Sequence, residues 1–262
     1  MEAVKRNNVN VIGQGETPML FAHGYGCDQN MWRHITPAFE NDYKIVLFDH
    51  IGFGQSDVKE YDPTHYNSLH SYAADIVEIC EELGLQDVVF VGHSVSAIIG
   101  LLASLQAPSL FSKLILIAPS PRYINDGDYT GGFSQEAIED LLSTLESDYL
   151  GWANAITPVI MGNPNMPALA EELAGSFCRS NVAVAKDFAR LTFLSDNRAD
   201  LPNVKTDTLI LQCSEDAIAP LSVGKYMQEQ MPHSKLLLLE ATGHCPNLSA
   251  PEETIAAMKT FL

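Results

Sequence analysis

The chain has 262 residues, with 33 acidic and 15 basic side chains and a formal net charge of −18. This length suits one α/β domain with room for an insertion. The negative charge argues against nucleic acid and anionic lipid surfaces as partners, because their phosphates would be repelled. The longest apolar stretch, Val95 to Leu105, contains Ser96, Gly100 and Ser104 and is shorter than the roughly 20 residues of a membrane span. We therefore expect that the chain does not span a membrane.

The N-terminus and the cysteines indicate the compartment. No apolar core follows the N-terminal charges, so no signal peptide is expected and the predicted location is cytoplasmic. The cysteines are odd in number and never spaced as C-x-x-C, which favours free thiols over a disulfide framework or a metal site. They are Cys27, Cys80, Cys178, Cys213 and Cys245.

Short β-branched or leucine-rich runs alternate with helical patterns along much of the chain. The predicted strands are Val9–Ile12, Met19–Ala22, Lys44–Asp49, Val88–Gly92, Lys113–Ala118, Thr208–Cys213 and Lys235–Glu240. The last five are almost continuously apolar, which predicts strands buried on both faces of a parallel sheet. The predicted helices between them are Gln29–Phe39, Ser68–Leu83, Ser94–Gln106, Val223–Gln230 and Glu252–Phe261.

The alternation stops at Ala118 and resumes at Thr208. The intervening segment contains four helical patterns, Gln135–Glu146, Leu150–Ile160, Ala168–Arg179 and Val184–Leu194, with Pro158, Pro164 and Pro167 as expected breakers. We interpret this segment as a helical cap inserted over the sheet. The predicted organisation is a core of residues 1–118 and 201–262 and a cap of residues 119–200.

A strand runs directly into a helix at Ser94. In a nucleophile elbow, G-x-S-x-G, small residues flank a strained serine because strand and helix come very close. Gly92 and Ser96 flank Ser94 here, so a serine replaces the final glycine of the motif. The alternative is that Ser94 only caps the N-terminus of the helix.

A serine nucleophile needs a general base, and the base needs an orienting acid. In a hydrolase fold the acid follows a late strand and the histidine follows the last strand. Asp216 and His244 stand at those two places. The sequence therefore predicts a triad of Ser94, His244 and Asp216.

Other charged residues near these positions are weaker candidates. Glu215 could replace Asp216 as the acid, but Asp216 is favoured because it lies in the turn that leads to Pro220 and the next helix. Asp207 precedes its strand and is interpreted as a surface residue. His93 adjoins the nucleophile and is assigned a structural role.

Acyl transfer also needs two N–H donors aimed at the developing oxyanion. Val95 N–H, next after the nucleophile, is the first predicted donor. The second is Tyr25 N–H, which lies between Gly24 and Gly26 in the turn after an early strand. The alternative is that these glycines only make a turn, and His23 is expected to orient the loop.

Five segments resemble a known family: His23–Gln29, Phe48–Asp57, Gly92–Ala97, Pro119–Phe133 and Gly243–Pro246. With the elbow and the late acid and histidine, they identify the chain as similar to the α/β-hydrolase superfamily. The resemblance is to its RsbQ-like branch, which contains a bacterial stress-signalling hydrolase and the plant karrikin and strigolactone receptors. It implies a mostly parallel central sheet flanked by helices, with an inserted four-helix cap.

The resemblance also implies a small apolar cavity lined by residues matching Tyr25, Tyr123, Phe133, Trp152 and Phe193. From the sequence alone, aromatic residues in the cap could equally be its own core. The family further implies a PAS-domain phosphatase partner in a stress response.

Two functions follow as hypotheses. The first is a serine hydrolase of small apolar esters or lactones, which needs no metal or organic cofactor. The second is a ligand-responsive signalling protein that binds a small hydrophobic ligand and for which hydrolysis is secondary.

Overall fold

The centre of the molecule is a seven-stranded sheet in the order β1-β3-β2-β4-β5-β6-β7, in a computed structural model that describes residues 2–262. β1 runs antiparallel to β3, and every other neighbouring pair is parallel. The strands are β1 (Asn10–Ile12), β2 (Thr17–Ala22), β3 (Tyr43–Leu47), β4 (Val88–His93), β5 (Phe111–Ile117), β6 (Asp207–Glu215) and β7 (Ser234–Thr242). All seven predicted strands are confirmed.

Burial falls from the middle of the sheet to its edges. Every residue of β4 is buried, as the apolar run predicts for a central parallel strand. The same prediction is wrong for β7, where Leu239 is buried but Leu238 is 50% exposed. Among the described strands β7 pairs with β6 alone and is therefore an edge strand, so its leucine content does not predict its position in the sheet.

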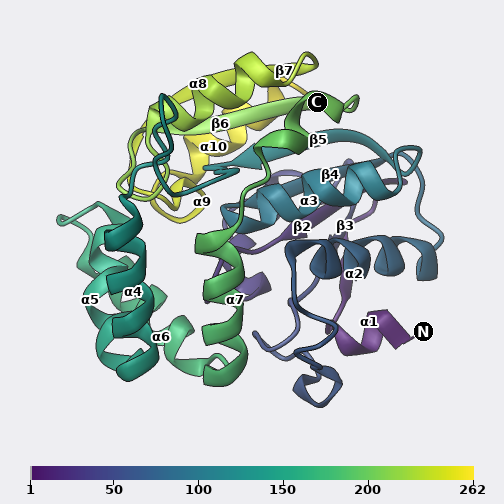
Figure 1. Ribbon diagram of the computed structural model, residues 1–262. Helices are drawn as coiled ribbons and strands as arrows, with labels where there is room; N and C mark the ends of the chain where they lie inside the picture. Colours follow the sequence, from purple (N-terminus) through teal and green to yellow (C-terminus); the bar gives the residue numbers. More distant parts are fainter. Residues whose placement is uncertain (1) are drawn as a thin grey trace.

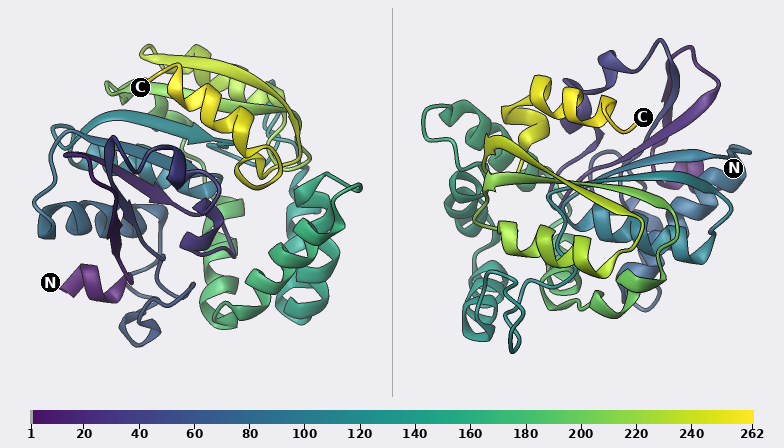
Figure 2. Two further views of the ribbon diagram at one scale, coloured as in Figure 1. Left: turned by 180° about the vertical axis from the view of Figure 1, so that it is seen from behind. Right: turned by 90° about the horizontal axis from the view of Figure 1, so that it is seen from above.

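Helices cover both faces of the sheet, and Figure 2 shows α10 on one side with α3 and α8 on the other. α2 packs on α3 beside β4, whereas α9 and α10 contact β7 on the opposite face. These helices are α1 (Glu2–Arg6), α2 (Leu69–Glu82), α3 (Val95–Gln106), α8 (Leu221–Gln230), α9 (Pro246–Ser249) and α10 (Pro251–Lys259). No helix within residues 2–262 has the length and apolar character needed to cross a membrane.

Four more helices, α4 (Gln135–Ser147), α5 (Tyr149–Met161), α6 (Pro167–Arg179) and α7 (Val182–Leu194), lie between β5 and β6 in the chain. They stand together beside the carboxyl ends of the strands, at the left of Figure 1. Their positions agree with the four helical patterns of the sequence.

The helices differ from the sequence predictions in three respects. The predicted helix Gln29–Phe39 is wrong: two short 3₁₀ segments, Gln29–Trp32 and Thr36–Ala38, replace it, because Pro37 supplies no N–H for a continuous helix. α1 and α9 were not predicted, since one helical turn is too short to show a periodic apolar face.

Pro158 does not break its helix, although the sequence predicts a breaker there. α5 continues through Pro158 to Met161 and ends at Gly162, whose φ of 60° suits a glycine after a helix. Pro158 removes the donor for the carbonyl of Asn154, but both residues are exposed, so water can bond to that carbonyl.

Candidate active site

The turn at Ser94 has the backbone strain expected of a nucleophile elbow. Ser94 joins β4 to α3 with φ 57° and ψ −125°, a conformation that residues with a side chain rarely adopt. A Cβ at Gly92 would lie 2.6 Å from the Ser96 carbonyl oxygen, so only glycine fits there. The tight turn places the Ser94 hydroxyl at the carboxyl end of the sheet.

Ser94, His244 and Asp216 form one hydrogen-bonded chain. Ser94 Oγ lies 2.7 Å from His244 Nε2, and His244 Nδ1 lies 2.7 Å from Asp216 Oδ2. Ser94 and His244 are 6% and 4% exposed. The Asp216 carboxylate can orient the imidazole so that Nε2 accepts the proton of the serine.

The carboxylate of Asp216 is fixed by its own turn. Its Oδ1 accepts hydrogen bonds from Ile218 N at 2.8 Å and Ala219 N at 3.0 Å. Burial alone would raise the pKa of Asp216, but His244 and these hydrogen bonds lower it below its usual value. Glu215 is exposed, and Asp207 stands at the opposite end of β6. The geometry thus brings Asp216, and neither of the other two, to His244.

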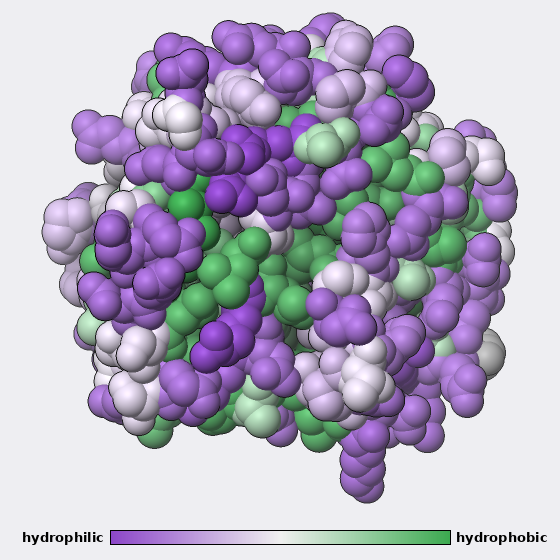
Figure 3. Space-filling model, viewed as in Figure 1, coloured by the Kyte–Doolittle hydropathy of each residue, from purple (hydrophilic) through white to green (hydrophobic). Residues whose placement is uncertain are grey.

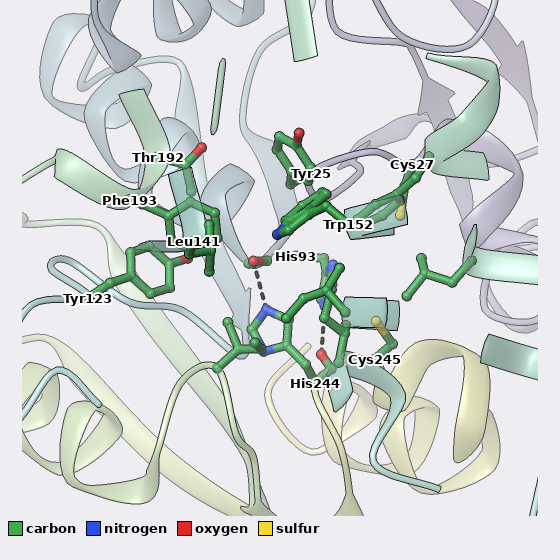
Figure 4. Close-up of a pocket in the computed structure, with 16 residues that line it drawn as sticks. Tyr25, Cys27, His93, Tyr123, Leu141, Trp152, Thr192, Phe193, His244 and Cys245 are labelled. Carbon is green, nitrogen blue, oxygen red and sulfur yellow. Dashed lines mark hydrogen bonds between the residues drawn. The ribbon is translucent and has the colours of Figure 1, made fainter. Parts of the chain in front are cut away.

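His93 supports the main chain beside the triad. Its Nε2–H donates to the carbonyl oxygen of His244 at 2.7 Å, drawn as a dashed line in Figure 4. Burial and the neighbouring His244 lower the pKa of His93 to about 3, so the ring stays neutral. This arrangement fits the structural role expected for His93.

Two N–H groups stand where the oxyanion donors are expected. Val95 opens α3, and the first N–H groups of a helix have no partner within it. The turn after β2 carries Tyr25, whose N–H donates to no acceptor within residues 2–262. The Tyr25 hydroxyl donates to the carbonyl of Ala185 in α7 at 3.0 Å, which ties this turn to the cap.

An apolar cavity opens onto the triad. Its volume is about 40 Å³, room for a few water molecules. Besides Ser94, His93 and His244, it is lined by Tyr25, Cys27, Tyr123, Leu141, Trp152, Ile156, Ile160, Leu173, Phe177, Thr192, Phe193, Ile218 and Cys245. Figure 3 shows apolar side chains gathered around a hollow where the cap meets the core.

Four of the five expected lining residues reach this cavity. In Figure 4, Trp152 lies above the His244 ring, and Tyr123 and Phe193 lie to its upper left. The Tyr123 hydroxyl is close to the Ser94 side chain. The prediction that Phe133 lines the cavity needs correction, because Phe133 is not among the lining residues within 2–262. It is half-buried in the loop before α4, where its N–H donates to the carbonyl of Tyr123.

Sequence reasoning missed one face of α5. Trp152, Ile156 and Ile160 all line the cavity, and they are spaced four residues apart. Residues at that spacing share one face of a helix. This periodicity was a readable signal for two further lining residues.

We searched the described residues for side chains that could bind a metal ion. Within residues 2–262, no three His, Cys, Asp or Glu side chains are grouped so that they could hold an ion. The five cysteines are free thiols.

Comparisons with known proteins agree with this fold. The family model of the α/β hydrolase fold matches residues 17–251. The chain is 35% identical to Karrikin insensitive 2 receptor CA of Petunia hybrida over 96% of this chain and 94% of that protein. It is 37% identical to Strigolactone esterase D14 of Arabidopsis thaliana, over 97% of this chain and 96% of that protein.

A solved structure is similar over the whole length. A hydrolase from Oleispira antarctica shares 42% identity with a TM-score of 0.97, covering 99% of this chain and 96% of that one. The similarity to plant karrikin and strigolactone proteins confirms the resemblance drawn from the motifs. By fold, family model and relatives, the chain belongs to the α/β hydrolase fold family.

Proposed function

We propose that this chain is a serine hydrolase of small apolar esters or lactones. The observation that carries the proposal is the hydrogen-bonded chain Ser94–His244–Asp216 at the wall of an apolar cavity. A serine with a bonded imidazole and a buried carboxylate is the arrangement that activates a hydroxyl for attack on a carbonyl.

Acylation uses the proton path that the distances define. His244 Nε2 takes the proton of Ser94 as Oγ forms a bond to the carbonyl carbon of the substrate. The carbonyl oxygen becomes an oxyanion, which the N–H groups of Tyr25 and Val95 stabilise. His244 then gives the proton to the leaving alkoxide, and the alcohol departs.

Deacylation repeats these steps with water. His244 takes a proton from a water molecule whose oxygen bonds to the acyl carbon. When the tetrahedral intermediate collapses, the bond from the acyl carbon to Ser94 Oγ breaks, His244 Nε2 returns the proton to Oγ, and the acid departs. Asp216 stays ionised throughout and stabilises the imidazolium. Its lowered pKa supports this role.

The cavity indicates the size of the acyl group. A volume of about 40 Å³ holds only a few heavy atoms, and the lining offers mostly hydrocarbon and aromatic surface. We therefore expect turnover to fall steadily from acetyl to hexanoyl esters of one phenol.

The test is labelling with a fluorophosphonate followed by mass spectrometry of the peptides. We expect one adduct, on Ser94, and no ester turnover by Ser94→Ala. Ser104→Ala is the matched control, since Ser104 is also buried on α3 and its hydroxyl, within residues 2–262, bonds only to the carbonyl of Leu101 in its own helix. An adduct on another residue, or undiminished turnover by Ser94→Ala, would reject the proposal.

A second candidate is a ligand-responsive signalling protein. The 35% identity with a Petunia hybrida protein named as a receptor favours it. It predicts that a small hydrophobic ligand changes the cap and that a partner, such as the PAS-domain phosphatase implied by the family, binds only the liganded form. Binding of that partner to Ser94→Ala with and without ligand separates the candidates. The partner and the cytoplasmic location remain predictions.

A further inference from the structure

We propose that Ser96 is a positioning residue, which with His50 and His23 forms a buried hydrogen-bond relay that aims the Tyr25 N–H at the oxyanion. The inference rests on the proposed function, because an oxyanion donor matters only if Ser94 attacks a carbonyl. The inference gives a role to Ser96, which stands where the elbow motif usually has its last glycine.

The direction of each hydrogen bond in the relay follows from counting protons. The Ser96 hydroxyl has one proton, which it donates to the carbonyl of His23. His50 Nε2 lies 2.7 Å from the same Ser96 Oγ, so Nε2 carries a proton and donates it to Ser96. His50 Nδ1 then carries none, which agrees with its having no partner within residues 2–262.

The ring of His23 has an equally defined state. Its Nε2 accepts a hydrogen bond from the backbone N–H of His50 at 3.0 Å. Its Nδ1 must therefore carry the proton, and it donates to the carbonyl of Gly24 at 2.9 Å. Cys27 N–H donates to the same carbonyl at 3.2 Å.

These bonds hold two consecutive peptide units of the turn. Ser96 holds the carbonyl of His23, and the His23 ring holds the carbonyl of Gly24. The Gly24 carbonyl and the Tyr25 N–H belong to one planar trans peptide, so they point in opposite directions. Fixing that carbonyl therefore fixes the direction of the Tyr25 N–H.

The relay also sets the distance between nucleophile and donor. Ser96 lies two residues after Ser94 at the start of α3, so the helix that carries the nucleophile also holds the turn that carries the donor. A glycine at position 96 would leave the His23 carbonyl and His50 Nε2–H without partners.

The hydrogen bonds of the relay are buried, which makes the loss of any one of them costly. Ser96, His23 and His50 are all 0% exposed, so water cannot replace a lost partner. Burial also lowers the pKa of both histidines, which keeps the rings neutral as the bond directions require. His50 is enclosed by the rings of Phe48 and Tyr72, at centroid distances of 5.0 and 5.7 Å.

The experiment uses the whole chain with Ser96→Ala and Ser96→Gly, and with Ser104→Ala as the control. Steady-state turnover of a phenyl acetate gives kcat and KM, and the amide resonance of Tyr25 in ¹⁵N-labelled protein reports the turn directly. Loss of an oxyanion donor costs about 100- to 1,000-fold in kcat, so a misdirected donor should cost roughly 10- to 100-fold. KM should stay within about twofold, because the ground-state carbonyl needs the donor less.

His50 supplies a second pair of variants, which serves if the Ser96 variants fold poorly. His50→Phe removes the donor to Ser96 and should lower kcat and shift the Tyr25 resonance as Ser96→Ala does. His50→Gln keeps an N–H donor and should retain most of the activity. The effects of Ser96→Ala and His50→Phe should not add in the double variant.

Three results would overturn the relay: a kcat of Ser96→Ala equal to that of Ser104→Ala, a loss confined to KM, or an unmoved Tyr25 resonance. If the unaltered protein neither hydrolyses the ester nor labels at Ser94, the proposed function fails instead. The Tyr25 resonance then decides by itself whether Ser96 positions the turn.

Discussion

Replacing Gly24 by alanine tests how tightly the turn after β2 packs against the triad. A Cβ at position 24 would lie 2.4 Å from His93 Nδ1 and 3.1 Å from His93 Cε1. Ordinary carbon contacts begin near 3.4 Å, so the His93 ring or the turn must move by roughly 1 Å.

Neither group can move that far without breaking a bond. His93 Nε2 donates to the carbonyl of His244 at 2.7 Å, and the Gly24 carbonyl accepts from His23 and Cys27. Overpacking of this kind costs about 1–3 kcal/mol of stability. A displacement of about 1 Å in a catalytic group can cost about 100-fold in rate. We expect Gly24→Ala to lose about 2 kcal/mol of unfolding free energy and about 100-fold in kcat.

The measurements are urea unfolding and ester turnover, with Gly175→Ala as the matched control. Gly175 lies within α6, where the one close neighbour of an added Cβ, among the residues the structure describes, is the Arg179 side chain at 3.4 Å. That variant should gain about 0.5–1 kcal/mol from helix propensity and keep its activity. If Gly24→Ala is as stable as Gly175→Ala and within about threefold of full activity, the packing argument is refuted.

Three further outcomes are expected. Asp216→Asn should lower kcat about 1,000-fold or more, because an amide leaves the His244 ring in the wrong tautomer; a loss below about tenfold in turnover assays would contradict this. Burial lowers the pKa values of His23, His50 and His93, so the unfolded chain binds more protons below about pH 6.5, and stability is lost as the pH falls. Asp75, whose pKa burial raises to about 6, offsets one of these protons. Urea unfolding should thus show a fall of roughly 2 kcal/mol per pH unit between about pH 6 and 4.5, and a flat profile would contradict it. Finally, a thiol reagent should rapidly modify Cys178 alone, because the other four cysteines are buried and burial raises their pKa values; fast modification of two or more thiols in the native protein would contradict that burial.

Local sequence patterns were enough to predict the strands and helices that have a strong hydrophobic periodicity. The seven strands and the four cap helices lie where the apolar runs predict, because most of them bury a face whose spacing is visible in the sequence. β1 is an exception, since all three of its residues are exposed. The prediction was wrong at Gln29–Phe39 and at Pro158, where one proline interrupts a helix and the other does not. Arg33 and Asn154, whose carbonyls lose their helical donors, are both exposed, so access to water does not explain the difference.

The sequence predicted the reactive residues of the candidate site, but it predicted only some of the residues that line the cavity. The positions of Ser94 and His244 at the ends of predicted strands were readable, since the elements on either side were readable. The lining was less so: Phe133 lies away from the cavity, whereas Ile156 and Ile160 line it. Aromatic character does not reveal which way a loop turns its side chains.

The order of strands, helices and reactive residues is a property of the sequence by itself, because each depends on neighbours a few positions away. The tertiary structure alone decided that Asp216 and not Glu215 bonds to His244, and that Ser96 bonds to the turn carrying Tyr25. Those contacts join residues 28 and 73 positions apart in the chain. They exist only once the sheet has brought the carboxyl ends of its strands together, which no local pattern encodes.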